Sequence, residues 1–333
     1  MENLTHTLTG LMIAQAGFSR RVPRVAIVCM LAANAPDIDV VSAFFGSHVY
    51  LEQHRGFTHG ILAVPLLALL CTLAGRVFVR SGYPWLLAFC AALTAGFSHL
   101  LLDWTNIYGI RLLAPFSNYW YRGDIASVFD PLLCLLLVAG ALWPLLGRLV
   151  NQEIGSRTQY GTGTPRTVLV VAAIYLGARG MLHERALAQM NARLYDGQEA
   201  LSTAAFPHLA NPLRWTGLVD LPKSYRILPV NLLTEFDPDA GKVLYKGAEH
   251  NRAALAAAKS RPFQSLIQFA PFLFWQVGGD VVPDEVSRVE ANDLRFGLPG
   301  EGRFTATAVL KPDFTIISSE FHFTPQGELP RPR

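Results

Sequence analysis

Seven histidine and aspartate residues in the first third of the chain have the chemistry of metal ligands. Each lies at or near the end of an apolar segment, where polar side chains are costly to gather unless they serve a purpose. Imidazole and carboxylate ligands without a thiolate favour zinc, with manganese as the alternative. We predict that they form one metal site. The seven residues are His6, Asp37, Asp39, His54, His59, His99 and Asp103.

Three short spacings group these ligands. His99 and Asp103 are four residues apart, which puts both side chains on one face of a helix. Asp37 and Asp39 form an Asp-x-Asp turn after a proline, and the block His54–His59 reads His-Arg-Gly-Phe-Thr-His. Taken singly, each spacing has a plainer interpretation: a hydrogen bond between helices, a capping turn or a basic loop at the membrane surface. Their combination favours the metal site.

The number of ligands would also allow two metal ions. Two ions about 4 Å apart are a common arrangement for the hydrolysis of phosphoesters. In such a site Arg55 could bind a phosphate oxygen through its forked guanidinium. Thr58 and Asn106 could donate hydrogen bonds to the metal ligands. We therefore name Arg55 and Thr58 as candidate catalytic residues.

The composition places these residues in a membrane protein. Hydrophobic residues make up 51% of the 333 residues and charged residues only 16%, whereas about 25% is usual for soluble proteins. Nearly all of the apolar excess lies in residues 1–183. Four segments are long enough to span the hydrocarbon core, and two shorter ones before them could form a buried or re-entrant hairpin. The spans are 60–80, 84–103, 128–147 and 166–183, and the hairpin segments are 4–18 and 22–35.

This order of segments brings the candidate ligands to one side of the membrane. Asp130 opens a span from the same side, where it could cap that helix or serve as a ligand. Basic residues in short loops stay in the cytoplasm. We therefore predict that the ligands and residues 184–333 are extracytoplasmic. The opposite side receives eight arginines: Arg20, Arg21, Arg24, Arg76, Arg80, Arg148, Arg157 and Arg166.

Residues 184–333 have the composition of a soluble domain. Runs rich in aromatic and β-branched residues predict strands in it. We expect an antiparallel, β-rich α+β domain that covers the site, holds substrate or binds a partner. The predicted strands are 213–219, 224–232, 272–277, 303–310 and 314–323, and helices are expected at 184–205 and 248–259.

Four motifs follow one another in the first half of the chain: Thr-His-x-x-x-Gly (Thr5, His6, Gly10), Pro-Asp-x-Asp (Pro36, Asp37, Asp39), His-Arg-Gly-x-Thr-His (His54–His59) and His-x-x-x-Asp (His99, Asp103). On these motifs, residues 1–150 resemble the LexA-regulated, membrane-bound metal-dependent hydrolase family of bacterial inner-membrane proteins. The resemblance implies a multi-helix membrane hydrolase that uses a divalent metal, and it implies no substrate. Gly60 departs from the family, which usually has serine there. The fourth motif is more distantly similar to zinc-dependent phospholipase C.

The predicted fold is a membrane α-helical bundle of about four transmembrane helices plus an N-terminal helical hairpin (residues 1–183), followed by a β-rich α+β extramembrane domain (residues 184–333). The predicted function is hydrolysis of a phosphoester or lipid-linked substrate by a metal-activated water, in the bilayer of the bacterial inner membrane. The alternative is a non-enzymatic membrane protein with a metal-binding or structural site.

Three further observations narrow the class of protein. A net charge of +3 and the lack of a basic stripe in the sequence argue against nucleic acid as a partner. The four cysteines all lie in apolar stretches, where we expect them to pack within helices. The first ten residues carry an acid and no basic residue, which predicts no cleavable signal peptide.

Overall fold

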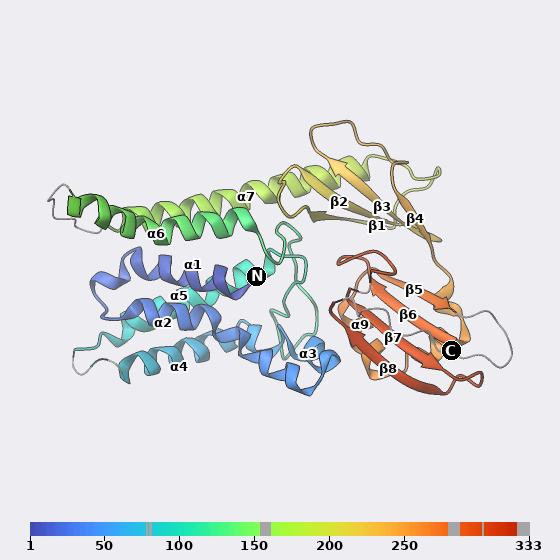
Figure 1. The fold of residues 1–333 in the computed structure, drawn as a ribbon, viewed down its shortest axis with the longest axis horizontal. Coiled ribbons are helices and arrows are strands. Elements are labelled where there is room, and N and C mark those ends of the chain that lie inside the picture. The colour runs from blue at the N-terminus through green and yellow to red at the C-terminus, as the bar shows by residue number, and fades with distance from the viewer. Residues whose placement is uncertain (78, 80–81, 154–160, 279–286, 302, 325–333) are drawn as a thin grey trace.

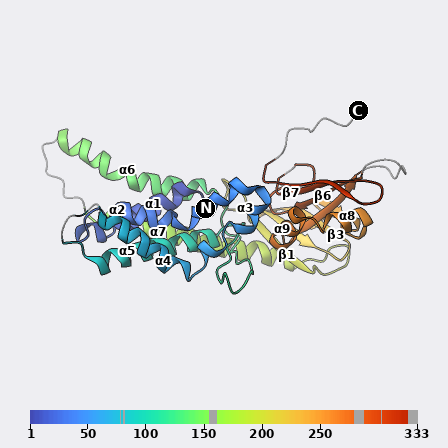
Figure 2. The ribbon, with the colours of Figure 1, turned by 90° about the horizontal axis from the view of Figure 1, so that it is seen from below.

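The computed structural model describes residues 1–77, 79, 82–153, 161–278, 287–301 and 303–324, with the backbone alone for 144–153. The molecule is elongated, with a helical bundle at one end and two β-sheets at the other (Figures 1 and 2). The predicted order, helical first and β-rich second, is confirmed.

Small residues let the central helices of the bundle approach closely. A Cβ added at Gly10 would lie 2.6 Å from the carbonyl oxygen of Cys29, and one at Gly96 would lie 2.8 Å from Cγ1 of Val64. Close approach of backbones through small residues is typical of helices packed in membranes. The central helices are α1 (Asn3–Gln15), α2 (Val25–Asn34) and α5 (Trp85–Trp104). The first two form the predicted hairpin (Figure 1).

Among the described residues, three helices are long and apolar enough to cross a membrane: Val25–Phe45, which joins α2 to the 3₁₀-helix η2 (Ala35–Phe45), then α5, and α7 (Gly163–Asn191). A helix pair, Ser47–His59 and Ala63–Val77, is bent by 78° and would be a fourth candidate if counted as one broken span. The prediction of four spans plus a hairpin is therefore wrong in number.

The number differs because the helices begin and end at unexpected places. The second hairpin helix continues into η2 and becomes long enough to span. The predicted span 60–80 shortens to α4 (Ala63–Val77), because Gly60 is extended and the Ile61 N–H donates to the Leu112 carbonyl at 2.9 Å. The predicted span 128–147 corresponds to α6 (Pro131–Glu153), whose described apolar part is a short helix.

Asp130 caps helix α6. Its Oδ1 accepts hydrogen bonds from the N–H groups of Leu132 and Leu133, both at 3.1 Å, and the Tyr175 hydroxyl donates to both carboxylate oxygens at 2.9 and 3.0 Å. These bonds satisfy the first amides of the helix. Of the two roles that the sequence left open for Asp130, the structure shows the cap.

The β-rich half consists of two antiparallel four-stranded sheets, each with its strands in sequence order. The prediction of an antiparallel, β-rich domain is confirmed. The first sheet contains β1 (Ser202–Pro207), β2 (Arg214–Asp220), β3 (Ser224–Asn231) and β4 (Lys242–Tyr245). The second contains β5 (Leu273–Gly278), β6 (Ser287–Asp293), β7 (Thr305–Leu310) and β8 (Ile316–His322).

The five predicted strands correspond to β2, β3, β5, β7 and β8, within two residues at each end. The predicted helix 184–205 is wrong beyond Asn191, because the chain turns at Gly197 (φ 74°) and then enters β1. The predicted helix 248–259 divides into η4 (Ala248–His250) and α8 (Arg252–Ala257). The helix α9 (Arg261–Phe269) was not predicted.

The second sheet and α9 pack directly on the end of the bundle. Ser265 of α9 donates to the carboxylate of Glu52 on α3 (Ser47–Gln53) at 2.7 Å, and the guanidinium of Arg295 donates to the carbonyl of Ile107 at 2.9 Å. Leu51 and Tyr108 of the helical half belong to the same hydrophobic core as the second sheet. This contact fixes a sheet over the end of the bundle where the candidate ligands lie.

Candidate metal centre

Four of the seven predicted ligands converge at the end of the bundle that faces the sheets. Asp37 lies on η2, His59 on η3 (Phe57–His59), and His99 and Asp103 on the last turns of α5. One ligand atom from each lies within 4.8 Å of the other three. His59, His99 and Asp103 are fully buried, while Asp37 is partly exposed.

The distances among these atoms resemble the edges of a tetrahedral ligand shell. His59 Nε2 lies 3.0 Å from His99 Nε2, 3.4 Å from Asp37 Oδ1 and 3.5 Å from Asp103 Oδ2. His99 Nε2 lies 3.7 Å from Asp37 Oδ1 and 3.5 Å from Asp103 Oδ2. Four ligands at zinc distances of about 2.1 Å stand about 3.4 Å apart at tetrahedral corners. Small shifts would therefore suffice to bind one ion.

The outer hydrogen bonds of the two histidines orient their lone pairs toward this centre. His99 Nδ1 lies 2.7 Å from the carbonyl oxygen of Ala33. His59 Nδ1 lies 3.2 Å from the Thr58 hydroxyl, which itself donates to Asp39, and 3.2 Å from a carboxylate oxygen of Asp39. The carbonyl and the carboxylate can only accept, and the hydroxyl hydrogen is already used, so we assign the proton of each ring to Nδ1 and a lone pair to each Nε2. Two imidazole lone pairs and two carboxylates then face one another, an arrangement that a cation stabilises.

His6 lies against the same group. Its ring stacks on that of His99 with the centroids 3.9 Å apart, and its Nε2 is 3.3 Å from Asp103 Oδ1. The side chain is fully buried, and neither ring nitrogen makes a hydrogen bond within the described part of the chain. A buried imidazole without a partner is costly. His6 is therefore a candidate fifth ligand.

Asp39 holds the loop that carries two of the histidines. Its carboxylate accepts from His54 Nδ1 at 2.8 Å, from the Arg55 backbone N–H at 2.8 Å and from the Thr58 hydroxyl at 3.0 Å, besides its contact with His59. Carboxylates that bind the outer nitrogen of a metal-ligating histidine fix its orientation and raise its basicity. Asp39 contacts the outer nitrogen of His59 in this way.

A second possible ligand group consists of Asp37, Asp39 and His54. Asp37 belongs to both groups, and its Oδ2 has no hydrogen-bond partner among the described residues. A carboxylate placed in this way could bridge two ions. The two-metal arrangement stays a prediction, with Asp37 as its shared ligand.

Arg55 binds the ligand Asp103. Its Nη2 donates to Asp103 Oδ1 at 3.1 Å, its Nε lies 3.0 Å from Oδ2, and its Nη1 donates to Asn106 Oδ1 at 2.9 Å. Asn106 in turn donates to Asp103 at 3.3 Å. In this arrangement the arginine and the asparagine orient Asp103, and the guanidinium lies beside the ligand group.

Sequence reasoning missed two contributors to the centre. One is the main-chain carbonyl of Ala33, which fixes the ring of His99 and has no side-chain signature. The other is Tyr108, whose ring faces the Arg55 guanidinium at 4.7 Å and whose buried hydroxyl has no partner among the described residues. Burial raises the pKa of Tyr108, so the phenol stays neutral at pH 7. Only the proximity of Tyr108 to Asn106 in sequence could have indicated it.

A cavity of about 430 Å³ opens beside the metal centre. This volume falls in the range of small-molecule sites. Its lining combines ligand-group residues with apolar side chains from both halves of the chain. The lining residues are Met1, Asn3, Asp37, Val40, Tyr50, His54, Arg55, Tyr108, Val128, Phe296, Phe304 and Phe323.

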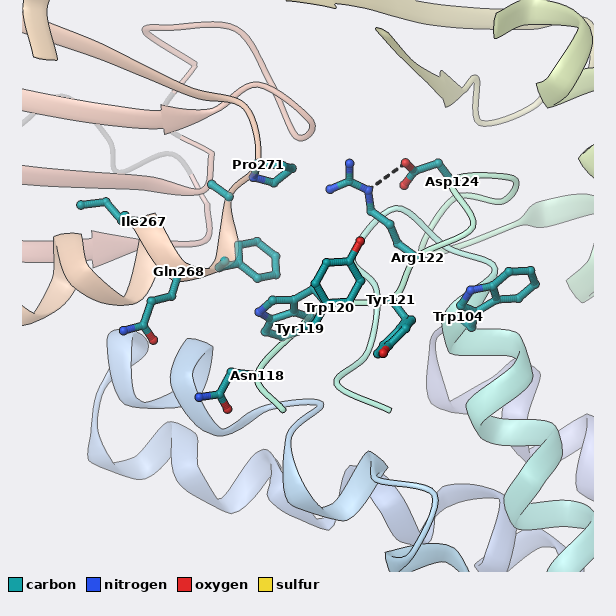
Figure 3. Close-up of a pocket in the computed structure, with 12 residues that line it drawn as sticks. Trp104, Asn118, Tyr119, Trp120, Tyr121, Arg122, Asp124, Ile267, Gln268 and Pro271 are labelled. Atoms are coloured by element: carbon teal, nitrogen blue, oxygen red, sulfur yellow. Dashed lines mark hydrogen bonds and ion pairs between the residues drawn. The ribbon is translucent and has the colours of Figure 1, made fainter. Parts of the chain in front are cut away.

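A second cavity, of about 610 Å³, lies between the loop after α5 and the segment that joins α9 to β5 (Figure 3). Arg122 donates to Asp124 at 2.9 Å across one wall, and burial raises the pKa of the Asp124 carboxyl although Arg122 acts in the opposite direction. None of the seven candidate ligands lines this cavity. The cavity that adjoins the metal centre is therefore the one that concerns the chemistry.

The helical half that carries this centre matches a known family model. The model, described as YdjM inner membrane protein, covers residues 1–186. The chain belongs to this family. The match includes all seven candidate ligands and ends five residues before the last residue of α7.

Two curated proteins are similar to part of the chain. The Bacillus subtilis (strain 168) protein named Uncharacterized protein YfhP is 31% identical over 157 residues, which are 43% of this chain and 46% of that protein. The Escherichia coli (strain K12) protein named Inner membrane protein YbcI is 34% identical over 121 residues, which are 34% of this chain and 68% of that protein. The chain thus spans about half of the first relative and two thirds of the second. No solved structure matches the chain.

Proposed function

We propose that this YdjM-family protein is a membrane-embedded, metal-dependent hydrolase that acts on a phosphoester or lipid-linked substrate. The observation that carries the proposal is the convergence of two imidazole lone pairs and two carboxylates in a buried group beside a cavity. Zinc suits this donor set, and manganese is the alternative. When bound, such an ion lowers the pKa of a water molecule and polarises a phosphoryl oxygen.

The residues around the ion have separate tasks in this proposal. His59, His99 and Asp103 hold the ion, and Asp37, the one partly exposed member, lies where the group meets the cavity. Arg55 fixes Asp103 and presents positive charge beside the cavity, where it favours an anionic substrate. A neutral Tyr108 hydroxyl in the cavity wall is a further donor for a substrate oxygen.

One observation favours a second function, a metal-binding site without catalysis. Three of the four ligands are fully buried, and structural metal sites are typically closed. In that case the ion would stabilise the contact between η2, η3 and α5, and no substrate would reach it. The accessible edge at Asp37 argues for the catalytic function.

The experiment that tests the proposal combines metal analysis with an activity screen. The full chain is purified in detergent and its zinc and manganese content is measured, with about one ion or more per chain expected. Hydrolysis of phosphodiesters and phosphoester lipids is then measured with each added metal. Asp103→Asn should abolish both metal and turnover, whereas the control His250→Ala, a change at an exposed residue of the other half, should keep both.

The outcomes separate the two functions. Turnover that depends on added metal and on Asp103 supports the hydrolase. Bound metal without turnover on any member of the panel, together with an equal loss of folded protein in every ligand variant, supports the structural site. Less than about a tenth of an ion per chain, without gain on adding zinc or manganese, contradicts both.

A further inference from the structure

The cavity beside the metal centre is built by both halves of the chain. Asp37, His54 and Arg55 line it from the helical half. Phe296 and Phe304, near the ends of β6 and β7, line it from the second sheet. The second sheet lies outside the family match, which ends at residue 186. The charged and histidine side chains of the lining therefore belong to the family domain, which also contributes apolar residues such as Val40 and Val128, whereas the second half contributes aromatic rings alone.

The aromatic wall is an ordered cluster of rings. Phe296 and Phe304 stack with their centroids 3.7 Å apart, and Phe323 meets Phe304 edge-on at 5.2 Å. Phe304 has a positive φ of 46°, a conformation that bulky residues rarely adopt. Strained residues of this kind concentrate at sites of ligand binding. The cluster offers a large apolar surface to whatever enters the cavity.

Exposed apolar side chains of η2 lie beside the rim of this cavity. Val40 of η2 lines the cavity and is itself 54% exposed. On the same helix Phe44 and Phe45 are 90% and 73% exposed. This helix is the end of the candidate span Val25–Phe45. Exposed apolar residues at the end of a span lie against lipid. The cavity rim therefore adjoins the membrane surface.

From this geometry we infer that the occupant of the cavity is a membrane amphiphile with an anionic phosphoryl head group. Its head group lies at the metal centre and Arg55, and its apolar chain lies against Phe296, Phe304 and Phe323, which select for the chain. A cavity of about 430 Å³ holds the head group and the first part of one chain. This inference rests on the proposed function and assigns a role to the second half of the protein.

The test measures binding of two phosphonates, which are not hydrolysed, to the zinc-loaded full chain by titration calorimetry. Methylphosphonate reports the head-group contacts, and hexylphosphonate adds five methylene groups. Each fully buried methylene strengthens binding by about fourfold. Because only part of the hexyl group would be buried, we expect hexylphosphonate to bind at least about tenfold more tightly than methylphosphonate.

Three variants test which side chains contact the hexyl group. Phe304→Ala and Phe296→Ala should each reduce the preference for hexylphosphonate to below about threefold and leave methylphosphonate binding unchanged. Phe314→Ala is the matched control, because Phe314 packs against the same core with φ 65° and does not line the cavity. The control should keep the full preference. If one of the two wall variants does not fold, the other still tests the inference.

Three results overturn the inference: equal affinities of the wild type for the two phosphonates, a preference for hexylphosphonate that survives both wall substitutions, or no binding of hexylphosphonate. If the preference for hexylphosphonate is observed but no phosphoester is hydrolysed, the proposed function alone is contradicted. If a phosphoester is hydrolysed but the two phosphonates bind equally, this inference alone is contradicted.

Discussion

The Nε2 atoms of His59 and His99 lie 3.0 Å apart, and a cation between them would remove the repulsion of two facing lone pairs. We expect His99→Ala to lower metal affinity by at least about tenfold, because it removes one of four converging ligands. Elemental analysis and a competition titration with a zinc indicator measure this change. The control is His250→Ala, which changes a histidine of 85% side-chain exposure.

One result for His99→Ala would contradict this prediction. Unchanged zinc content after the substitution would show that the ion, if present, does not lie between these imidazoles. The buried His6 would then be the next ligand to substitute, because its ring stacks on that of His99.

Asp39 gives a separate prediction at the residue scale, since its carboxylate orients His54 and His59. Asp39→Asn keeps the size of the side chain and removes the negative charge that holds His59 Nδ1–H. We expect metal affinity to fall by about 10- to 100-fold while the fold is retained. Titration of the apoprotein with zinc, alongside circular dichroism, measures both effects. A loss of folded protein as large as the loss of metal would contradict a supporting role.

The sequence was informative about which residues would meet and less so about what each does. The spacing of His99 and Asp103 on one helix face, and the short block from His54 to His59, required these groups to be neighbours. The pairing of Arg55 with Asp103 could not be predicted, because it depends on the left-handed backbone of Arg55 (φ 56°) and on the loop after α5. A main-chain ligand support such as the Ala33 carbonyl leaves no trace in residue types.

At the scale of elements, the crossing of α1 and α2 depends on Gly10. A methyl group there would lie 2.6 Å from the Cys29 carbonyl oxygen, which belongs to the backbone and cannot rotate away. We expect Gly10→Ala to destabilise the protein by about 1–3 kcal/mol and to weaken metal binding, because His6 and Ala33 lie on these two helices. Thermal unfolding and zinc content are the measurements.

The matched control for Gly10→Ala is Gly177→Ala on α7. A Cβ at Gly177 meets no atom within 4 Å, and alanine favours a helix over glycine by about 1 kcal/mol. The control should therefore be neutral or stabilising. Equal destabilisation by the two substitutions would show that helix propensity, and not the close crossing, determines the effect.

Helices were easier to predict than their ends. Long apolar segments identified α5 and α7, and Asp130 before Pro131 marked the start of α6. The extended backbone at Gly60 depends on pairing with the loop near Leu112, which is distant in sequence. The strands β1, β4 and β6 were missed because their sequences are short or polar, and their place in the sheets follows from pairing with stronger neighbours.

At the scale of the whole molecule, several of the predicted cytoplasmic arginines lie together at one end of the bundle. Arg20, Arg21 and Arg166 line a small cavity at the end away from the metal centre, and the Arg166 guanidinium donates to the carbonyl of Ala16 at 2.6 Å. The connection between α1 and α2 lies at that end (Figure 1). Of the other predicted arginines of this side, Arg80 and Arg157 lie outside the described residues, and only the backbone of Arg148 is described.

Because short basic loops stay in the cytoplasm, we predict that the arginine end lies in the cytoplasm and that the metal centre and the sheets lie outside it. A fusion of alkaline phosphatase to the C-terminus should be active, and a fusion of green fluorescent protein at the same place should be dark. The reverse pattern would put the metal centre at the cytoplasmic face and direct the substrate search to that leaflet. The clustering of the ligands would be unaffected.

The domain order was predictable from composition, but the contact between domains was not. Hydropathy separates an apolar first half from a soluble second half without showing where they touch. The contact depends on Leu51 and Tyr108, two residues of loops and short helices, entering the core of the second sheet. The aromatic wall of the cavity follows from that contact and was likewise invisible in the sequence.

Helix α7 passes from the bundle to the first sheet without a break. A continuous helix fixes the rotation of the sheet relative to the bundle. Its 29 residues extend about 44 Å, of which the hydrocarbon core takes about 30 Å. Beyond it, Ala186 and Met190 pack into the core of the first sheet. Inserting one residue in α7 would rotate that sheet by about 100° relative to the bundle, whereas four residues would return it to within about 40° of its original direction and raise it by about 6 Å. Hexylphosphonate binding by such insertion variants would show whether the first sheet must keep this angle and height for the aromatic wall beside the second sheet to meet the metal centre.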